Sequence, residues 1–509
     1  MIAIPVISEP QASGGQNCRG CASGSDQDRK ARQLALLREL DAAVGQSRVP
    51  SEPGLPAGST GVDAVSIERE LHPDRTVYHL DQAAPLPLLA VLSHRAVGGK
   101  HLWIGVEQAV VVVLDELDHE VMSLFHDGGS VAAAVDSLVQ RMPPTEALAR
   151  VSRLVGSLAT SGFLRGIEGY TERRSATPER FARFHLTKAC QLSCIHCYAD
   201  SSPHVDRSNE LPTERWERVV DEFAENGGER VLFSGGEALL HAGCVPLMTR
   251  AKALGLEVTL FSNGLLVPQF AAAIKDTVDQ IQISLDGPDE ASNDRIRGRN
   301  THKKILRAID VLLAQGTRVR LGMSVMEQNW EEWKRGFLGF AQRYAATPLE
   351  YRLSFGITHY GRGADLRDTL EVSETQPVVD RLLENTGKAR GGPRITRHTS
   401  GCGYCEQFVV GPDGTVYPCH LLDAPVAHID DQPVAQLTTT LRKIARLFDV
   451  DHTEGCNVCD IRYLCGGTCR VMNGQRTGSR LITTCRQADK DRRYGNLVDL
   501  YLQHNAAGN

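Results

Sequence analysis

The sequence predicts an α/β protein in which a partial (β/α)6 barrel lies between a winged-helix-like domain and a Cys-rich domain. Apolar strand-like runs alternate with helical patterns from about Arg183 to Phe355, which is typical of βα units and a parallel sheet. Short β-type runs followed by three amphipathic helices fill 76–165. Eight cysteines lie within 399–489. These three patterns set the order of the domains.

The length of 509 residues is too great for one ordinary core and suggests about three domains. Residues 1–70 are rich in Gly, Ser, Pro and Gln, apart from a helical-looking stretch at Asp28–Ala43. A Gly-rich basic stretch at Gly387–Pro393 indicates a linker. We divide the chain into a largely disordered tail at 1–70, a winged-helix-like domain at 71–168, the barrel at 180–370, a linker at 371–398, the Cys-rich domain at 399–489 and a C-terminal tail at 490–509.

The N-terminal domain is expected to contain a short sheet followed by three helices. Ser130 and Thr145 each follow a Gly or Pro break, so they are candidate N-caps of the second and third helix. The expected strands are Thr76–Leu80, His101–Gly105 and Ala109–Leu114, and the expected helices are Glu116–His126, Val131–Met142 and Thr145–Ser161.

The central domain is expected to form an open barrel, because six βα units are too few to close an eight-stranded one. Its expected strands are Phe184–Thr187, Arg230–Ser234, Glu257–Phe261, Gln280–Leu285, Arg318–Val325 and Tyr351–Phe355. Its expected helices are Thr213–Asn226, Val245–Leu254, His302–Gln315 and Glu331–Tyr344, with a further one at Thr375–Glu384.

Composition excludes several classes of protein. The formal charge of −6, from 56 Lys and Arg against 62 Asp and Glu, favours neither nucleic acid nor a membrane surface as partner. No apolar stretch approaches twenty residues, and the N-terminus lacks a basic region before an apolar core. We therefore expect a cytoplasmic protein with reduced thiols, in which metal binding is favoured over disulfides.

The spacing Cys190-x3-Cys194-x2-Cys197 indicates a soft-metal site in the loop after the first barrel strand. Active sites collect at this carboxyl end of parallel strands. Iron–sulfur clusters are normally held by four thiolates, so three leave one iron open to another ligand. A zinc knuckle or incidental cysteines are the alternatives, although structural zinc sites usually take four ligands.

Short motifs follow the next three strands: Ser234-Gly-Gly-Glu237, Ser262-Asn-Gly264 and Ser284-Leu-Asp-Gly287. Paired glycines allow backbone to approach a ligand closely, and a following carboxylate can accept from an ammonium group. Each motif alone is a weak signal. Their order at successive strand ends is a strong one.

On these motifs, residues 183–355 resemble the radical S-adenosylmethionine (radical SAM) enzymes. The resemblance implies a [4Fe–4S] cluster on the three loop cysteines, with SAM on its open iron. Cleavage of SAM would then give a 5′-deoxyadenosyl radical that abstracts hydrogen from the substrate. Two departures from the family pattern are Ala238, where Pro is common, and Ser262, where Thr is common.

The resemblance also implies which residues contact SAM. Tyr198 would pack near the adenine, Gly235, Gly236 and Glu237 would hold the methionine amino group, and Ser284 and Asp286 would lie near the ribose and carboxylate. Ordinary strand-end capping is the alternative for Ser284 and Asp286. The full implied set is Tyr198, Gly235, Gly236, Glu237, Ser262, Asn263, Ser284 and Asp286.

The C-terminal cysteines resemble the SPASM extension of radical enzymes that modify peptides and proteins. The resemblance implies two auxiliary [4Fe–4S] clusters, making three in all. One would be held by Cys402, Cys405, Cys419 and Cys469, and the other by Cys456, Cys459, Cys465 and Cys485. Two zinc sites are the alternative, because the same spacings suit zinc.

His420 follows Cys419, where sulfatase maturases carry an acidic base, and this difference counts against formylglycine formation. His420 is a candidate catalytic proton acceptor, and an exposed loop histidine is the alternative. Cys18 and Cys21 form a CxxC pair in the N-terminal tail, where an incidental pair is the simplest interpretation. Cys244 begins an apolar helix and is interpreted as a buried small hydrophobe.

Residues 76–165 resemble the leader-recognition domain of pyrroloquinoline quinone biosynthesis (PqqD-like), in which a leader peptide adds a strand to a sheet edge. A generic winged-helix scaffold is the alternative. We expect a radical SAM enzyme that installs a thioether or C–C crosslink, or a related oxidation, on a ribosomally made precursor peptide. Flavodoxin or ferredoxin would supply electrons. A radical enzyme on a small molecule such as a haem-pathway intermediate, and a non-catalytic iron–sulfur adaptor, are the alternatives.

Overall fold

The computed structural model describes residues 68–71, 76–79, 81–165, 180–355, 357, 359–366, 370, 375, 378–379, 399, 401–422 and 424–506. The tail expected at 1–70, apart from Glu68–Glu70, lies outside these residues, as do the Asp28–Ala43 helix and the Cys18–Cys21 pair. Nearly all of the expected linker and of the Thr375–Glu384 helix also lies outside them.

Six parallel strands form the central sheet in the order of the chain, each paired with the next. They are β6 (Phe181–His185), β7 (Arg230–Ser234), β8 (Glu257–Ser262), β9 (Gln280–Ser284), β10 (Val319–Val325) and β11 (Glu350–Phe355). The parallel α/β sheet is confirmed, and all six strands lie within three residues of their expected bounds.

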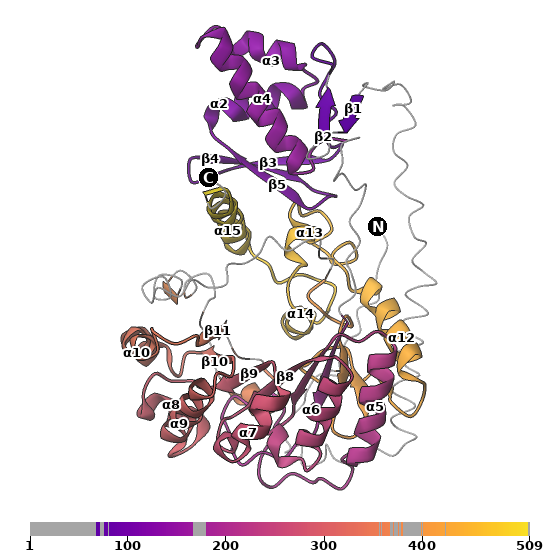
Figure 1. Cartoon of the computed structure of the whole chain (residues 1–509), viewed down its shortest axis with the longest axis vertical. Coiled ribbons are helices and arrows are strands. Elements are labelled where there is room, and N and C mark those ends of the chain that lie inside the picture. Colours follow the sequence, from indigo (N-terminus) through magenta and orange to yellow (C-terminus); the bar gives the residue numbers. More distant parts are fainter. Residues whose placement is uncertain are drawn as a thin grey trace.

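Helices cover the outer face of this sheet, as Figure 1 shows. The helices between strands are α5 (Thr213–Glu225), α6 (Cys244–Ala253), α7 (Val267–Thr277), α8 (Glu290–Arg297), α9 (Thr301–Ala314) and α10 (Trp330–Arg343), with short turns η1 (Ala238–Leu240) and η2 (Gly361–Asp365). One continuous apolar core joins these helices to the strands, and Trp216 and Trp333 are fully buried in it. Cys244 is buried there too, as expected.

The Cys-rich segment extends the barrel sheet. Strand β12 (Phe408–Val410) pairs in parallel with β6, and β13 (Thr415–Tyr417) and β14 (Ala427–His428) continue antiparallel. Helix α12 (Val434–Leu447) packs its apolar side into the same core. Two shorter helices follow, α13 (Arg462–Cys465) and α14 (Arg470–Thr477). The expected Cys-rich domain therefore shares its sheet and part of its core with the barrel.

The N-terminal module contains the hairpin of β1 (Glu68–Leu71) and β2 (Thr76–His79) and a three-stranded antiparallel sheet. That sheet comprises β3 (Leu92–Val97), β4 (Lys100–Gly105) and β5 (Val110–Leu114), with positive-φ Gly98 and Gly99 forming the tight turn between the first two. The helices α2 (Glu116–His126), α3 (Val131–Leu138) and α4 (Pro144–Thr160) follow in the expected order and cover one face of the sheet.

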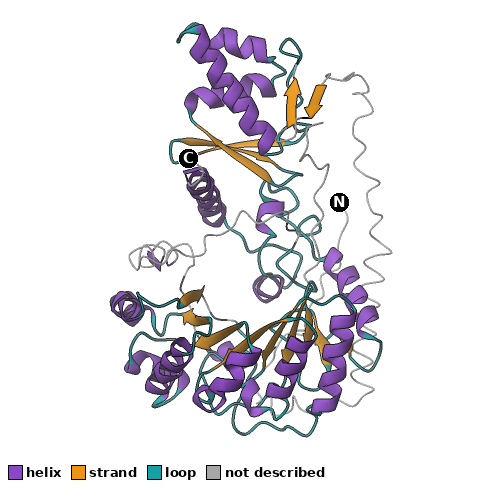
Figure 2. Ribbon diagram, viewed as in Figure 1, coloured by secondary structure: helices purple, strands orange, loops and turns teal. Residues whose placement is uncertain are grey.

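The other face of this sheet is covered by α15 (Gln487–Ala506), as Figure 2 shows. Leu102, Ile104, Val111 and Val113 pack there against Tyr494, Leu497 and Val498. The C-terminal tail expected at 490–509 is thus wrong for the residues up to 506, which form a helix. The physical reason is the apolar spacing of Tyr494, Leu497, Val498 and Tyr501, which gives the helix one buried side.

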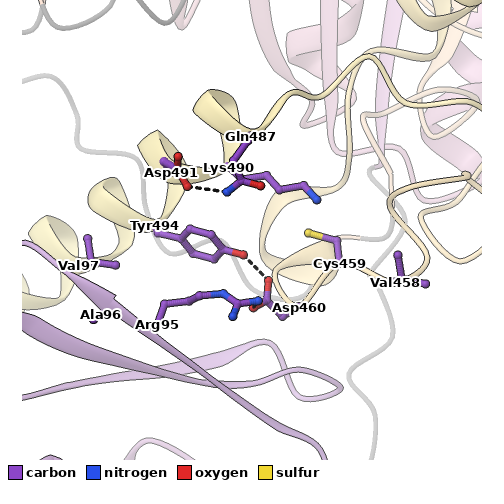
Figure 3. A pocket seen from close by; sticks show the side chains of 10 residues that line it. All are labelled: Arg95, Ala96, Val97, Val458, Cys459, Asp460, Gln487, Lys490, Asp491 and Tyr494. Carbon is purple, nitrogen blue, oxygen red and sulfur yellow. Dashed lines mark hydrogen bonds and ion pairs between the residues drawn. The ribbon is translucent and has the colours of Figure 1, made fainter.

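Asp460 joins the module to the Cys-rich segment. Its carboxylate accepts hydrogen bonds from Ser93 Oγ at 2.7 Å and Tyr494 OH at 2.5 Å, and pairs with Arg95 at 2.9 Å. Beside this junction lies a cavity of about 510 Å³ that is also lined by Cys459 and Lys490 (Figure 3). The module is therefore docked directly on the segment that carries the last five cysteines, from Cys456 to Cys485.

Among the residues that the structure describes, no helix combines the length and the hydropathy needed to cross a membrane.

Candidate functional site

The cysteine loop begins where β6 ends and is fixed at its base by Glu210. The Glu210 carboxylate accepts from Thr187 Oγ1 at 2.5 Å and from the Lys188 amide at 2.9 Å. Further along, the Cys190 amide donates to the Ser202 carbonyl at 3.2 Å. All twelve described cysteines are free thiols, including the three in this loop.

The Gly-Gly-Glu segment after β7 runs against the backbone of this loop. The Gly236 amide donates to the Thr187 carbonyl at 2.7 Å, and the Glu237 amide donates to the Ala189 carbonyl at 2.9 Å. A Cβ on Gly235, whose φ is +145°, would lie 2.4 Å from the Thr187 carbonyl oxygen, and one on Gly236 would lie 2.3 Å from that of Ala189. Both positions require glycine because the two backbones touch.

Glu237 is completely buried and accepts hydrogen bonds from the end of β8 and from the turn η1. Ser262 Oγ lies 3.0 and 3.1 Å from its two carboxylate oxygens, and the Asn263 amide donates at 2.8 Å. The Leu239 amide adds a longer bond at 3.3 Å. Burial raises the pKa of Glu237 to about 7 despite these donors. The carboxylate therefore ties the second strand end to the third.

Asn263 connects this network to the first cysteine. Its Nδ2 donates to Gln191 Oε1 at 3.1 Å and lies 3.6 Å from Cys190 Sγ. Burial, with smaller contributions from Glu237 and Cys194, raises the pKa of Cys190 to about 11. The thiol therefore keeps its proton until a metal displaces it.

Asp286 lies at the fourth strand end with its carboxylate turned into protein. Oδ2 lies 2.7 Å from Arg297 Nε and 3.2 Å from His196 Nε2, while Oδ1 accepts from the Ser324 amide at 2.8 Å. These contacts match the capping alternative for Asp286. Ser284 precedes it on β9 and is partly exposed.

Two cationic residues that the sequence did not single out hold the cysteine loop. Arg297, at the end of α8, brings its carbonyl 4.0 Å from Cys194 Sγ, and its cation lowers the pKa of that thiol against the larger opposing effect of burial. Arg362 donates to the Cys194 carbonyl at 2.9 Å and the Ser201 carbonyl at 2.6 Å. The sequence could have indicated His196 as a site residue, because it lies between Cys194 and Cys197. The sequence could not indicate Arg297 and Arg362, because each reaches the loop from a distant part of the chain.

The C-terminal cysteines fall near one another in two groups. Burial, and then neighbouring Cys419 and Cys402, hold the pKa of Cys405 well above its usual value, and burial with a contribution from Cys402 raises that of Cys469. In the other group, burial, then Asp460 and then Cys465 raise the pKa of Cys459, and burial, then Asp489 and then Cys465 raise that of Cys485. The Cys459 amide also donates to the Cys456 carbonyl at 2.9 Å.

His420 and Tyr198 meet beside β6, with ring centroids 6.4 Å apart in an edge-on contact. Burial raises the pKa of Tyr198 to about 12. The structure leaves His420 exposed, as the exposed-loop alternative expected, while partial desolvation, followed by the cations of Arg183 and Arg352, lowers its pKa. The lowered pKa keeps His420 neutral near pH 7 and makes it a weaker base than an ordinary histidine.

The fold and the cysteine loop define an α/β domain with a thiolate site at the carboxyl end of its sheet. Residues 184–335 match the model of the radical SAM superfamily, so this part of the chain carries a radical SAM domain. SAM and one [4Fe–4S] cluster are the cofactors that such a domain implies.

Two curated relatives and one solved structure are similar to this chain. The AdoMet-dependent heme synthase of Methanosarcina barkeri is 25% identical over 336 residues, covering 59% of this chain and 94% of the relative. The PqqA peptide cyclase of Granulibacter bethesdensis is 27% identical over 321 residues, covering 58% and 84%. The solved structure of native anSMEcpe with bound AdoMet and Kp18Cys peptide has a TM-score of 0.52 at 19% identity, over 64% of this chain and 99% of that chain. The last similarity concerns the fold alone.

Proposed function

We propose that this enzyme makes a radical-mediated modification, a thioether or C–C crosslink or a related oxidation, on a ribosomally synthesised precursor peptide. The observation that carries the proposal is the N-terminal module, docked on the Cys-rich segment through Asp460 and α15. Its three-stranded sheet has β3 and β5 at its edges, and an extended leader peptide can pair with an exposed edge. The similarity to a PqqA peptide cyclase supports the same substrate class.

The residues of the cysteine loop fit an open iron–sulfur cluster. Cys190, Cys194 and Cys197 are three free thiols on one loop, and thiolate is the donor that iron–sulfur clusters take. When bound, the cluster and SAM would supply the radical that removes hydrogen from the peptide. Arg297 and Arg362 fix the loop, and Asn263 donates toward Cys190 Sγ.

SAM would be held by the strand ends that surround the loop. Gly235 and Gly236 bring the backbone close, Tyr198 offers an aromatic face, and Ser284 is partly exposed beside them. Glu237, Ser262 and Asn263 form one hydrogen-bonded unit, so any contact of Glu237 with the methionine ammonium would add to these bonds. Asp286 would act through Arg297 and His196.

The C-terminal segment would be a SPASM domain with two auxiliary [4Fe–4S] clusters. The proximity within each cysteine group supports one cluster on Cys402, Cys405, Cys419 and Cys469 and another on Cys456, Cys459, Cys465 and Cys485. His420, exposed and next to Cys419, is the candidate acceptor of the proton released as the new bond forms. Flavodoxin or ferredoxin would supply electrons, and the enzyme would work in the cytoplasm.

A haem-pathway intermediate is the second candidate substrate, because the AdoMet-dependent heme synthase is comparably similar to this chain. The test uses the full-length, anaerobically reconstituted enzyme with SAM and dithionite. Three substrates are compared by mass spectrometry: the peptide encoded by a short reading frame beside the gene, its leaderless core, and an iron porphyrin. Loss of hydrogen from the full precursor, with little change in the leaderless core, supports the proposal. Turnover of the porphyrin alone would replace it with the second candidate.

A further inference from the structure

Three histidines of the N-terminal module bring their rings together between the sheet and a helix. His94 lies on β3, His101 on β4 and His119 on α2, and each offers one ring nitrogen within 4.8 Å of the other two. The strand register pairs His94 with Trp103 and Ala96 with His101, so both strand histidines project from the same face. The cluster lies outside the residues that match the radical SAM family.

Neighbouring groups fix the hydrogens on two of these rings. His101 Nε2 lies 2.8 Å from Glu116 Oε2, and since a carboxylate accepts, this nitrogen carries the hydrogen and Nδ1 keeps a lone pair. Trp103 Nε1 donates to His119 Nδ1 at 3.1 Å, so that nitrogen also has a lone pair. His94 Nε2 lies 3.0 Å from His101 Nδ1. His101 Nδ1 and His119 Nδ1 are thus unprotonated, the form that binds metal ions, and here they accept hydrogen bonds from His94 Nε2 and Trp103 Nε1.

Burial, followed by the neighbouring histidines, lowers the pKa of both His94 and His119, which keeps these rings neutral near pH 7. The rings are stacked, with centroids 3.8 Å apart for His101 and His119 and 4.3 Å apart for His94 and His119. An ion would therefore be bound after a ring rotation that points the three lone pairs to one centre. All three side chains are only partly buried, which permits this rotation.

We propose that His94, His101 and His119 bind one divalent transition-metal ion of the zinc type. Imidazole is a preferred zinc ligand, and three protein ligands leave a fourth position open. Glu116 would take the supporting role of a carboxylate that orients a metal-bound histidine through its other nitrogen. The ion would cross-link β3, β4 and α2, and so hold an edge strand of the sheet to the helix above it.

Zinc content provides the direct test. The full-length enzyme is reconstituted with iron, equilibrated with zinc sulfate, freed of unbound metal and analysed for both elements. Wild type should hold about one zinc per chain more than the His101→Gln variant, at equal iron, since the three-histidine site supplies one ion. His126→Gln is the matched control, because His126 lies on the same helix near Trp103 but outside the cluster, and it should retain the zinc.

Glu116→Gln tests the site without risk to the core, since the Glu116 side chain is 76% exposed. Loss of the supporting carboxylate should weaken zinc binding about ten- to a hundredfold while leaving iron content unchanged. Nickel(II), a paramagnetic probe, should quench Trp103 fluorescence in wild type and in His126→Gln, because the Trp103 indole contacts His119 directly. Equal zinc in wild type and His101→Gln, or no zinc in wild type, would overturn the proposal.

Discussion

Arg297 Nε and Asp286 Oδ2 lie 2.7 Å apart inside the barrel, where the two side chains are 9% and 0% exposed. The same carboxylate accepts from the Ser324 amide and faces His196 of the cysteine loop. One buried charge therefore joins the fourth strand end, the end of α8 and the loop that carries the thiols. Asp286 therefore positions the cysteine loop through its contacts with His196 and Arg297.

Asp286→Asn should destabilise the barrel and lower its iron content. Breaking a buried ion pair from one side typically costs about 3–5 kcal/mol, because the other charge stays buried without compensation. Urea unfolding of the apo-protein and iron analysis after reconstitution would measure the two effects. Glu290→Gln is the control, since its partner Lys303 is 75% exposed and such surface pairs contribute only about 0–1 kcal/mol. A midpoint shift as small as the control's would contradict the positioning role.

Glu237→Gln should change how stability depends on pH. The folded-state pKa of about 7 lies above the ordinary value of 4.5, so the folded protein binds the proton more tightly than the unfolded one. Wild-type stability should therefore fall as pH rises from about 4.5 to about 7, by roughly 3 kcal/mol at most, and then level off. Glutamine cannot ionise, so the variant should lose most of this slope. Unfolding curves of both apo-proteins at several pH values would measure this difference. The same dependence of stability on pH in the wild type and the variant would contradict the prediction.

The same substitution should weaken SAM binding if the Glu237 carboxylate accepts from the methionine ammonium. A hydrogen bond to a charged group contributes about 1.5–3 kcal/mol, so affinity should fall roughly ten- to a hundredfold. Equilibrium dialysis against labelled SAM would measure the change, with the visible spectrum checking that the cluster is intact. Unchanged affinity would restrict Glu237 to its bonds with Ser262 and Asn263.

Replacing Cys190, Cys194 and Cys197 together with Ala should remove about four of about twelve irons, because each [4Fe–4S] cluster holds four. Cleavage of SAM should disappear in the same variant. Iron and sulfide analysis after anaerobic reconstitution provides the measurement. Cys244→Ala is the control, since Cys244 is buried in the apolar core and is not a cysteine of the loop, and its iron content should equal that of wild type. Two or three zincs with little iron in wild type would exclude the clusters.

Leu497→Ala should loosen the docking of the N-terminal module. Leu497 is 9% exposed and packs on the sheet through α15, and truncating a buried leucine costs about 2–5 kcal/mol. Leu502→Ala, on the same helix but 42% exposed, should change stability by about 0.5 kcal/mol or less. Limited proteolysis would report the difference as faster release of the module. Equal rates for the two variants would contradict the importance of this contact.

The strands of the barrel could be predicted because each is an apolar run bounded by polar or Gly-rich turns, as in Arg230–Ser234. Strands β12 to β14 could not, since runs of two or three residues carry no readable period. Helix α15 could have been predicted from its apolar side, which has helical spacing: Tyr494, Leu497, Val498 and Tyr501. The many charged residues of this segment made that spacing hard to recognise.

The cysteine loop and the strand-end motifs could be located from sequence because they are short and local. The hydrogen-bond and ion-pair partners of those residues could not be predicted from sequence. Asp286 reaches Arg297 and His196, and Glu237 reaches Ser262, only after the chain has folded. The local sequence around a carboxylate is the same whether its side chain contacts a ligand or only other groups of the protein.

The two faces of the N-terminal sheet are covered by segments that are translated at different times. Helices α2 to α4 emerge from the ribosome soon after β5, whereas α15 follows the whole barrel and the Cys-rich segment. Until then Leu102, Ile104, Val111 and Val113 face water or a transient partner. Such exposed apolar surface favours aggregation and chaperone binding during folding. The module therefore reaches its final form only after the barrel and the Cys-rich segment have been translated, and fragments that stop before Gln487 should be poorly soluble for that reason.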